Sequence, residues 1–409
     1  MSEIPQKVAD ETIARRSRLA TETRALADPV FWSSLSGLPF AFQGPLMRLS
    51  LFFAAVTLGL APVALTQSAA QGPTATDEPQ FSADRVRADV TYLADDKLEG
   101  RFTASKGYLT AAAYVAERFQ ALGLKPGGTD YPWFQLVPIR LPAGKVTRTY
   151  KAPNVIGILP GSDPVLKNEY VVLSAHLDHI GVDPRPGSDK IYNGAMDNAA
   201  GVATMLEAAR AFMTSGKPPR RSILFVALAG EEEGLLGSSY LAKNPVIGTG
   251  RVVADVNLDM PILLYDFQDV VAFGAEHSTL GPIVAAAGAK MGVTLSPDPM
   301  PEENLFVRSD HYSFVQAGVP SVFLVTGFKN GGEKAFRSFL KTHYHQVSDD
   351  LSLPFDWNAG AKFAKLNYLI AREIADGDVA PLWYDRDPFG ERFAPRAPKA
   401  PRPAPAAKL

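Results

Sequence analysis

The chain has 409 residues, of which 46% are hydrophobic and 21% are charged, and its formal net charge is −2. These values are typical of a globular protein with one large or two ordinary domains. They give no electrostatic case for binding nucleic acid or an anionic membrane. Because the sequence contains no cysteine, it excludes disulfides, thiolate zinc sites and cysteine nucleophiles, so a metal ion would have to be held by histidine, aspartate and glutamate.

The first feature along the chain is a short basic start, Met47-Arg48, followed by an apolar run to Ala61. Small residues at 68–70 then supply a cleavage point, which is the layout of a secretory signal peptide over residues 47–70. The apolar run is shorter than the ~20 residues that a membrane span needs, and Pro62 interrupts its end. We therefore expect an exported protein, periplasmic or secreted, with no stable membrane anchor after cleavage.

Three other terminal segments lie outside the expected folded domain, which we place at residues 81–390. Residues 1–46 precede the expected signal peptide and are a doubtful N-terminal extension, and residues 71–80 are expected to be a linker. Residues 391–409 form a tail rich in proline and alanine. Such a tail cannot bury enough apolar area to offset its chain entropy, so we expect it to be disordered.

Helices and strands alternate through the expected domain. Residues 82–93 and 105–122 are predicted helices, the second closed by Gly123 as a C-cap, and strands follow at 133–141 and 154–159. Further on, strands that are apolar on both faces alternate with helices. This pattern indicates a three-layer α/β sandwich with a mostly parallel central sheet. The later elements are strands at 170–176, 221–229, 252–258, 270–273 and 321–325, and helices at 198–213, 280–291 and 359–375.

Polar residues stand just past the ends of three predicted strands. His176 ends one strand, Glu231 and Glu232 follow the next along the chain, and Asp259 follows a third. Parallel strands place these ends at one edge of the sheet, where ligands bind in α/β folds. A polar loop delivers Asp197 to the start of an alanine-rich helix nearby in the sequence. We expect these distant segments to converge.

The candidate metal ligands are His176, Asp197, Glu232, Asp259 and His345. A hydrolytic site without a cysteine or an obvious serine nucleophile needs a metal ion to make hydroxide at neutral pH, and zinc accepts imidazole nitrogen and carboxylate oxygen. Asp197, held at a loop-to-helix junction, suits bridging two ions. Two divalent cations would balance three carboxylates and one hydroxide, whereas the carboxylates alone would repel one another.

Two further acidic residues fit supporting roles. Glu231 and Glu232 are neighbours, so their side chains diverge in an extended backbone, and one can bind metal while the other faces the substrate as general base. Asp178 lies two residues after His176, on the same side of an extended chain. We expect its carboxylate to accept the second N–H of that imidazole and so to orient the ring.

The order of six motifs makes a resemblance specific. From about Phe81 to Ala375 the chain resembles the di-zinc aminopeptidases of metallopeptidase family 28, whose fold is the zinc exopeptidase, or phosphorylase/hydrolase-like, α/β sandwich. The motifs are Ala175-His-Leu-Asp178, Asn193-Gly-Ala-Met-Asp197-Asn-Ala-Ala-Gly201, Ala229-Gly-Glu-Glu-Glu-Gly-Leu-Leu-Gly237-Ser, Asn257-Leu-Asp-Met260, Arg308-Ser-Asp-His311 and His343-Tyr-His345.

This resemblance implies two Zn²⁺ ions per chain, although other divalent metals are possible. His176, Asp197 and Asp259 would hold one ion, and Asp197, Glu232 and His345 would hold the other. The substrates implied are peptides with a free N-terminus, and the folded domain would be a zinc peptidase catalytic domain.

The resemblance also implies roles around the ions. Glu231 would be the general base, and Tyr344 resembles the oxyanion donor of the secreted bacterial members. Some relatives place that tyrosine where this chain has Phe306, which puts more weight on Tyr344. Arg308 resembles a residue that lines the substrate pocket, and a cis peptide is expected at Asp197-Asn198.

The sequence leaves other interpretations open. A glutaminyl cyclase or a carboxypeptidase-like enzyme can use the same scaffold, as can a non-catalytic receptor-like domain, but the complete ligand set and the lack of a visible clamp for a substrate carboxylate favour the aminopeptidase. Tyr344 could instead pack in the core, and Arg308 could form a surface ion pair. Histidines and aspartates outside the ligand set are expected to be structural, turn, supporting or surface residues: His179, His277, His311, His343, Asp310 and Asp349.

Overall fold

The computed structural model describes residues 78–403 apart from 144–145, 186 and 188. The expected N-terminal extension, the signal peptide, most of the linker and residues 404–409 of the expected tail lie outside the described residues. Among the helices that the structure does describe, none combines the length and the apolar character needed to cross a membrane.

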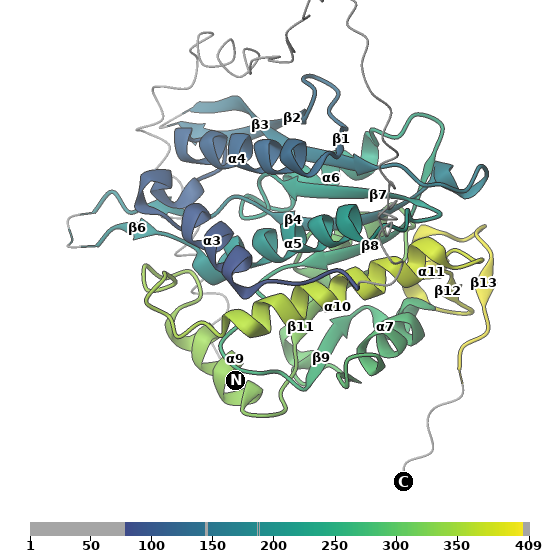
Figure 1. Cartoon of the computed structure of the whole chain (residues 1–409). Helices are drawn as coiled ribbons and strands as arrows, with labels where there is room; N and C mark the ends of the chain where they lie inside the picture. Colours follow the sequence, from purple (N-terminus) through teal and green to yellow (C-terminus); the bar gives the residue numbers. More distant parts are fainter. Residues whose placement is uncertain (1–77, 144–145, 186, 188, 404–409) are drawn as a thin grey trace, which may run out of the picture. The chain divides into compact units, whose positions relative to one another are not determined.

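Within the described residues, nine strands form one mixed sheet in the order β1-β3-β7-β4-β8-β11-β9-β10, with β2 paired to β3 beside this path (Figure 1). The centre is parallel: β4 lies between β7 and β8, and β8 pairs with β11. Antiparallel pairs, β3 with β7 and β11 with β9, flank it. The strands are β1 (Lys125–Pro126), β2 (Phe134–Ala143), β3 (Val146–Leu159), β4 (Glu169–His176), β7 (Ser222–Leu228), β8 (Arg251–Leu258), β9 (Asp269–Phe273), β10 (Thr294–Ser296) and β11 (Ser321–Thr326).

Helices pack on both faces of the sheet, so the predicted three-layer α/β fold is confirmed (Figure 1). One face carries α3 (Ala83–Leu93), α4 (Lys106–Leu122), α5 (Gly201–Thr214), α7 (Leu280–Ala289) and α10 (Trp357–Asp376). The other face carries α6 (Leu236–Lys243), α8 (His311–Gln316) and α11 (Pro388–Phe393). Helix α9 spans Gly332–Thr342. Two small two-stranded sheets are also present: β5 (Gly181–Val182) pairs with β6 (Ile191–Tyr192), and β12 (Trp383–Tyr384) pairs with β13 (Lys399–Ala400).

Local signals in the sequence set the first two helices. Ser82 is the N-cap of α3, and its hydroxyl accepts the N–H of Arg85. Ser105 caps α4 in the same way through the N–H of Tyr108, and α4 ends at Gly123, whose φ of 82° suits glycine. These contacts satisfy backbone groups that a helix end would leave unpaired, so the predicted boundaries agree with the structure to within a residue.

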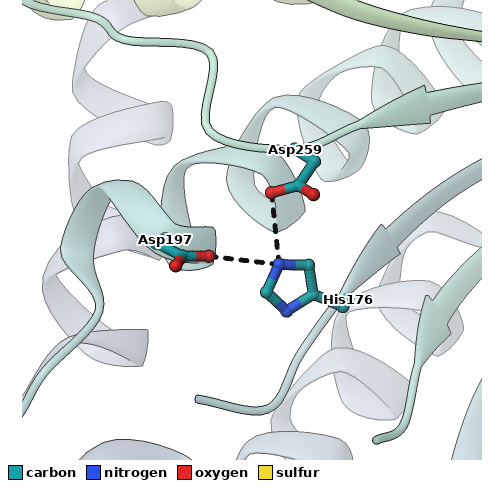
Figure 2. Close-up of side chains that lie close together, drawn as sticks. All are labelled: His176, Asp197 and Asp259. Atoms are coloured by element: carbon teal, nitrogen blue, oxygen red, sulfur yellow. Dashed lines mark hydrogen bonds and ion pairs between the residues drawn. The ribbon is translucent and has the colours of Figure 1, made fainter. Parts of the chain in front are cut away.

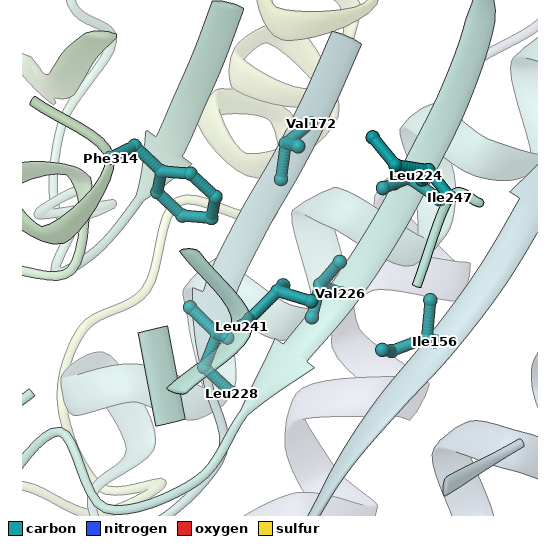
Figure 3. Packing of buried hydrophobic residues seen from close by; sticks show 8 residues of the cluster. All are labelled: Ile156, Val172, Leu224, Val226, Leu228, Leu241, Ile247 and Phe314. Carbon is teal, nitrogen blue, oxygen red and sulfur yellow. The ribbon is translucent and has the colours of Figure 1, made fainter. Parts of the chain in front are cut away.

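Apolar side chains fill the layer between the sheet and α6 and α8 (Figure 3). Leu224, Val226 and Leu228 of β7 meet Leu241 of α6, and Phe314 of α8 closes the same cluster. All seven residues of β7 are buried. Because both faces of the central strands are covered, these strands appear in the sequence as uninterrupted apolar runs.

One strand is longer than the sequence predicts. We expected a strand at 154–159, but β3 begins at Val146, and its residues 146–155 pair with β2. Of the added residues 146–153, the first four are exposed and only Ala152 and Pro153 are buried, so the added segment has no apolar alternation that would reveal the longer hairpin in the sequence.

The expected disorder of the tail is wrong for residues 391–403. Helix α11 runs to Phe393, and β13 pairs in parallel with β12. Polar contacts hold the segment: Arg402 donates to the carbonyl of Glu276 at 2.7 Å and to Asp387 Oδ2 at 3.0 Å. Composition misses this order because it comes from contacts with distant residues and not from an apolar pattern in the tail itself.

Candidate metal centre

The segments expected to converge do meet at one edge of the sheet. His176 is the last residue of β4, and Asp259 directly follows β8. Glu232 lies in the loop between β7 and α6, Asp197 lies in the turn before α5, and His345 follows α9. Four pairs of side-chain atoms, each 3.2–3.4 Å apart, link the five residues to one another. The parallel centre of the sheet places them there, as the sequence predicts.

Three of these residues form the first cluster (Figure 2). The Nε2 atom of His176 lies 3.2 Å from Asp197 Oδ1 and 3.2 Å from Asp259 Oδ1, and Figure 2 shows both carboxylates turned toward this nitrogen. All three residues are buried. The other oxygen of Asp259 accepts the hydroxyl of Ser309 at 2.6 Å, which fixes the orientation of that carboxylate.

The second cluster uses the other oxygen of Asp197. His345 Nε2 lies 3.3 Å from Asp197 Oδ2 and 3.4 Å from Glu232 Oε2. His179, which the sequence placed among the structural histidines, is also here, with its Nδ1 at 2.9 Å from Glu232 Oε1 and 3.7 Å from Asp197 Oδ2. Asp197 therefore connects both clusters, one oxygen to each.

The separations between donor atoms fit tetrahedral metal sites. A zinc ion with bonds near 2.0–2.1 Å sets neighbouring ligand atoms about 3.3 Å apart. The four distances from His176 and His345 to the carboxylates are 3.2–3.4 Å, whereas the two from His179 are 2.9 and 3.7 Å. Direct N–H···O hydrogen bonds are usually shorter, near 2.9–3.0 Å. Within each of two groups, the ligand atoms lie close enough together to bind one ion. These groups are His176/Asp197/Asp259 and His179/Asp197/Glu232. The donor set therefore fits two cations on either side of Asp197.

The electrostatics of the clusters also favour cations. Burial opposes ionisation of Glu232, but His345 and His179 hold the pKa of this carboxyl well below its ordinary value. Burial likewise opposes the charged form of His345, yet Glu232 and Asp197 raise its pKa to about 10. Buried carboxylates that stay charged need positive charge beside them.

Glu231 is electrostatically different from its neighbour. Burial raises the pKa of Glu231 well above its ordinary value; among charges, His176 lowers it, while Glu232 and Asp259 raise it further. A carboxyl with a raised pKa can both take up and release a proton near neutral pH. The pKa values of the two adjacent glutamates are thus shifted in opposite directions.

The expected contact between Asp178 and the imidazole of His176 is wrong. His176 Nδ1 lies 3.1 Å from the backbone carbonyl of Asp178, and the carboxylate points elsewhere. It accepts the N–H groups of Glu231 and Glu232, each at 3.2 Å, and the hydroxyl of Thr103 at 2.9 Å. The prediction assumed that the regular strand continues past His176, but β4 ends at this residue. Asp178 therefore positions the glutamate loop instead of the imidazole.

The turn that carries Asp197 has unusual backbone geometry. The Asp197-Asn198 peptide is cis, which confirms the expectation from the resemblance. Asn198 donates to the carbonyl of Leu258 at 2.9 Å and accepts the N–H of Gly201 at 3.0 Å. These hydrogen bonds fasten the turn to the end of β8 and to the start of α5.

Tyr344 and Arg308 lie beside the clusters with less specific contacts. The Tyr344 ring stacks on the ring of His345 with centroids 3.8 Å apart. Burial raises the pKa of Tyr344 well above 10, Asp197, Glu232 and Glu231 add to the shift, and the nearby charge of Arg308 opposes it. Arg308 is half-exposed and lies 3.6 Å from the carboxylate of Glu303, which is the surface ion pair that the sequence left open.

Two supporting residues were missed from the sequence. Arg101 is buried, and its guanidinium donates to the carbonyls of Leu177 at 2.9 Å and Gly194 at 3.0 Å, among others. His179 is buried beside Glu232. The position of His179, three residues after His176, was a signal available in the sequence. Nothing in the local pattern around Arg101 indicates that its side chain reaches these loops.

Comparison with known proteins agrees with this geometry. Residues 154–371 match the model of peptidase family M28. A probable leucine aminopeptidase of Arthroderma otae is 30% identical over 193 residues, which are 44% of this chain and 49% of the relative. The first five curated relatives are matched over only 39–64% of their own length, so this chain spans less than two thirds of each.

Solved structures share the fold at low sequence identity. A zinc aminopeptidase of Bacillus subtilis superimposes with a TM-score of 0.54 at 17% identity, over 74% of this chain and 98% of that one. A glutaminyl cyclase of Porphyromonas gingivalis gives the same TM-score and identity, over 72% of this chain and 99% of that one. The fold alone therefore does not separate these two reactions.

Proposed function

The chain belongs to peptidase family M28, and we propose that it is an exported zinc aminopeptidase that removes N-terminal residues from peptides. The observation that carries this proposal is the bridging geometry of Asp197, whose two oxygens face two separate histidine–carboxylate clusters. We favour this activity over the alternative reactions on the same scaffold, because a relative that is 30% identical over 193 residues is named a probable leucine aminopeptidase.

In this proposal the residues present would hold two zinc ions. His176, Asp197 and Asp259 would bind one, and Asp197, Glu232 and His345 would bind the other. When bound, the ions would lower the pKa of a water molecule and polarise the scissile carbonyl. Other divalent metals can use the same oxygen and nitrogen donors.

Glu231 is the proposed general base. Its carboxylate takes a proton from the attacking water and returns it to the departing amine, which requires a pKa closer to neutral than that of an ordinary glutamate. The raised pKa of Glu231 supports this role. Asp178 holds the backbone of both glutamates through two N–H groups, so the base and the neighbouring ligand keep a fixed relative position.

Tyr344 and Arg308 are the proposed substrate-side residues. The phenol of Tyr344 keeps its proton, since burial and three carboxylates raise its pKa, and it can donate a hydrogen bond to the developing oxyanion. Two observations support a role for Arg308: its charge lowers the pKa of Tyr344, and its guanidinium lies 3.6 Å from the Glu303 carboxylate. We propose that it lines the pocket.

Release of p-nitroaniline from a panel of amino-acid p-nitroanilides, with and without a chelator, tests the activity. We expect turnover that the chelator abolishes and zinc restores, and no turnover of N-acetylated substrates. Conversion of N-terminal glutamine to pyroglutamate without hydrolysis would identify a cyclase, and release from the C-terminus of blocked peptides a carboxypeptidase. Absence of both metal binding and turnover would identify a receptor-like domain.

The proposed export depends on residues 47–70, which lie outside the described residues. N-terminal sequencing of protein collected from outside the cytoplasm tests it. We expect the mature chain to begin near Gln71; a mature chain that begins within residues 1–46 would contradict the proposed signal peptide.

A further inference from the structure

His179 lies beside Glu232 at a distance that separates two possible roles. Its Nδ1 is 2.9 Å from Glu232 Oε1, which is the usual length of an N–H···O hydrogen bond. Two ligands of one zinc ion would lie about 3.3 Å apart, and His345 Nε2 does lie 3.4 Å from the other oxygen, Glu232 Oε2. Glu232 Oε1 thus lies at hydrogen-bond distance from His179, and Glu232 Oε2 lies from His345 at the distance expected for two ligands of one zinc ion.

The second nitrogen of each histidine supports the same distinction. A metal-binding imidazole almost always donates its other N–H to an acceptor, and His176 meets this condition, because its Nδ1 lies 3.1 Å from the carbonyl of Asp178. His179 does not: its Nε2 is buried and has no hydrogen-bond partner among the described residues. A ligand role through Nδ1 would place a proton on this nitrogen and leave a buried donor unpaired.

The ring of His179 is held in place by the protein itself. Its backbone N–H donates to the carbonyl of Arg101 at 3.2 Å. Gly194, with a φ of +59°, passes directly under the ring, and a Cβ at this position would lie 2.6 Å from the ring atoms Cγ and Cδ2. Gly194 therefore packs against the ring at Cγ and Cδ2, and the Nδ1 atom lies closer to Glu232 Oε1 than to Asp197 Oδ2, from which it is 3.7 Å away.

We propose that His179 is a positioning residue for the second metal site: it carries its proton on Nδ1, donates it to Glu232 Oε1, and so presents Glu232 Oε2 alone to the ion shared with Asp197 and His345. Single-oxygen binding by Glu232 keeps the number of protein ligands low and leaves a coordination position for water. This inference rests on the proposed zinc aminopeptidase function and adds one residue to its machinery.

The test compares His179→Ala with His179→Asn. Alanine removes the donor, whereas the asparagine amide can place an N–H₂ group near the position of Nδ1 and has no nitrogen lone pair for a metal. His277→Asn is the matched control, because its Nδ1 also faces a carboxylate, that of Asp387 at 2.8 Å, and its described contacts involve none of the proposed metal ligands.

Zinc dissociation constants, measured by competition with a chromophoric chelator, provide the readout. We expect His179→Ala to weaken the binding of one of the two zinc ions roughly 10- to 100-fold and to leave the affinity of the other ion unchanged. We expect His179→Asn to restore most of that loss. Unchanged affinities in His179→Ala would overturn the proposal. So would loss of one zinc ion in both variants, because that result identifies His179 as a ligand.

X-ray absorption of the zinc-loaded wild-type protein decides the same question without any variant. The proposal predicts two imidazole ligands for two zinc ions; three imidazoles would overturn it. Failure of the proposed function looks different, because the wild-type protein would then bind fewer than two zinc ions or would not release amino acids. Two bound ions and normal hydrolysis with no effect of His179→Ala would contradict this inference alone.

Discussion

Asp349 holds the backbone of Asp197 in place. Its Oδ1 accepts the N–H of Met196 at 2.8 Å, and its Oδ2 accepts the N–H of Asp197 itself at 3.0 Å. Asp349 lies four residues after His345, so this pair of hydrogen bonds ties the loop of one proposed zinc ligand to the turn that carries the bridging carboxylate. Burial raises the pKa of Asp349 to about 6, against the lowering effect of His179 and of these two amides.

We predict that Asp349→Asn weakens zinc binding about 10-fold or more. The variant keeps one acceptor oxygen but turns an N–H₂ group toward a backbone N–H, so one of the two hydrogen bonds becomes a repulsive contact. Zinc competition titration measures the effect. Asp350→Asn is the control, since its carboxylate accepts the N–H of Ser352; equal zinc affinity in both variants would contradict the role of Asp349.

We predict that Glu231→Gln abolishes turnover and keeps both zinc ions. Removal of a general base typically costs about 10²- to 10⁴-fold in rate, whereas the amide preserves the shape of the side chain. Steady-state kinetics and metal analysis of the same sample measure both effects. Glu233→Gln, two positions further on, should remain within a few-fold of the wild-type rate, and a near-normal rate for Glu231→Gln would refute the assignment of the base.

We predict that Arg101→Met strongly destabilises the folded protein. The guanidinium is buried and donates to four backbone carbonyls, and their loss leaves buried acceptors unpaired, at a cost of about 3–5 kcal/mol. Chemical denaturation of the zinc-loaded protein measures the loss. The exposed Arg87 offers a matched Arg→Met control, and a similar unfolding free energy for both variants would exclude the proposed role. The four acceptors are the carbonyls of Leu93, Leu177, Asn193 and Gly194.

We predict that His311 makes the fold sensitive to acid. Its ring is buried between Phe306 and Phe323, at centroid distances of 5.2 and 5.5 Å, and burial lowers its pKa from 6.5 to about 3. The folded state therefore keeps His311 neutral while the unfolded chain takes up a proton. The contribution of His311 to the free energy of unfolding is therefore fully present above pH 6.5 and is lost as the pH drops toward 3. Between pH 6.5 and 4 the loss is about 3 kcal/mol.

The variant His311→Phe removes this titration, so its unfolding free energy should fall less steeply between pH 6.5 and 4 than that of the wild type. The comparison of slopes cancels acid effects common to both proteins, including loss of metal. Denaturant titrations at a series of pH values measure the slopes. Parallel curves for the two proteins would contradict the prediction.

The central elements and the proposed ligands were predictable from the sequence because their signals are local. Ser82 and Ser105 cap helices through residues three positions away. His176 and Asp259 each end an apolar run, and the parallel pairing of such runs brings their ends together without any detailed knowledge of packing. The exposed start of β3 and the ordered part of the tail carry no such pattern.

The directions of side chains beyond a strand end were not predictable in the same way. Asp178 was assigned by the two-residue period of extended backbone, which stops at His176, and its carboxylate turns to the glutamate loop instead. His179 acts on Glu232, which lies 53 positions further along the chain. The sequence contains both residues, but only the three-dimensional structure shows how the intervening loops face each other.

A crystal structure of the zinc-soaked protein, with anomalous data collected at the zinc edge, tests the central claim most directly. We predict two anomalous peaks about 3.5–4 Å apart, one on each oxygen of Asp197, with His176 on one ion and His345 on the other. A single peak, no peak, or two ions that do not share Asp197 would contradict the proposed two-metal centre.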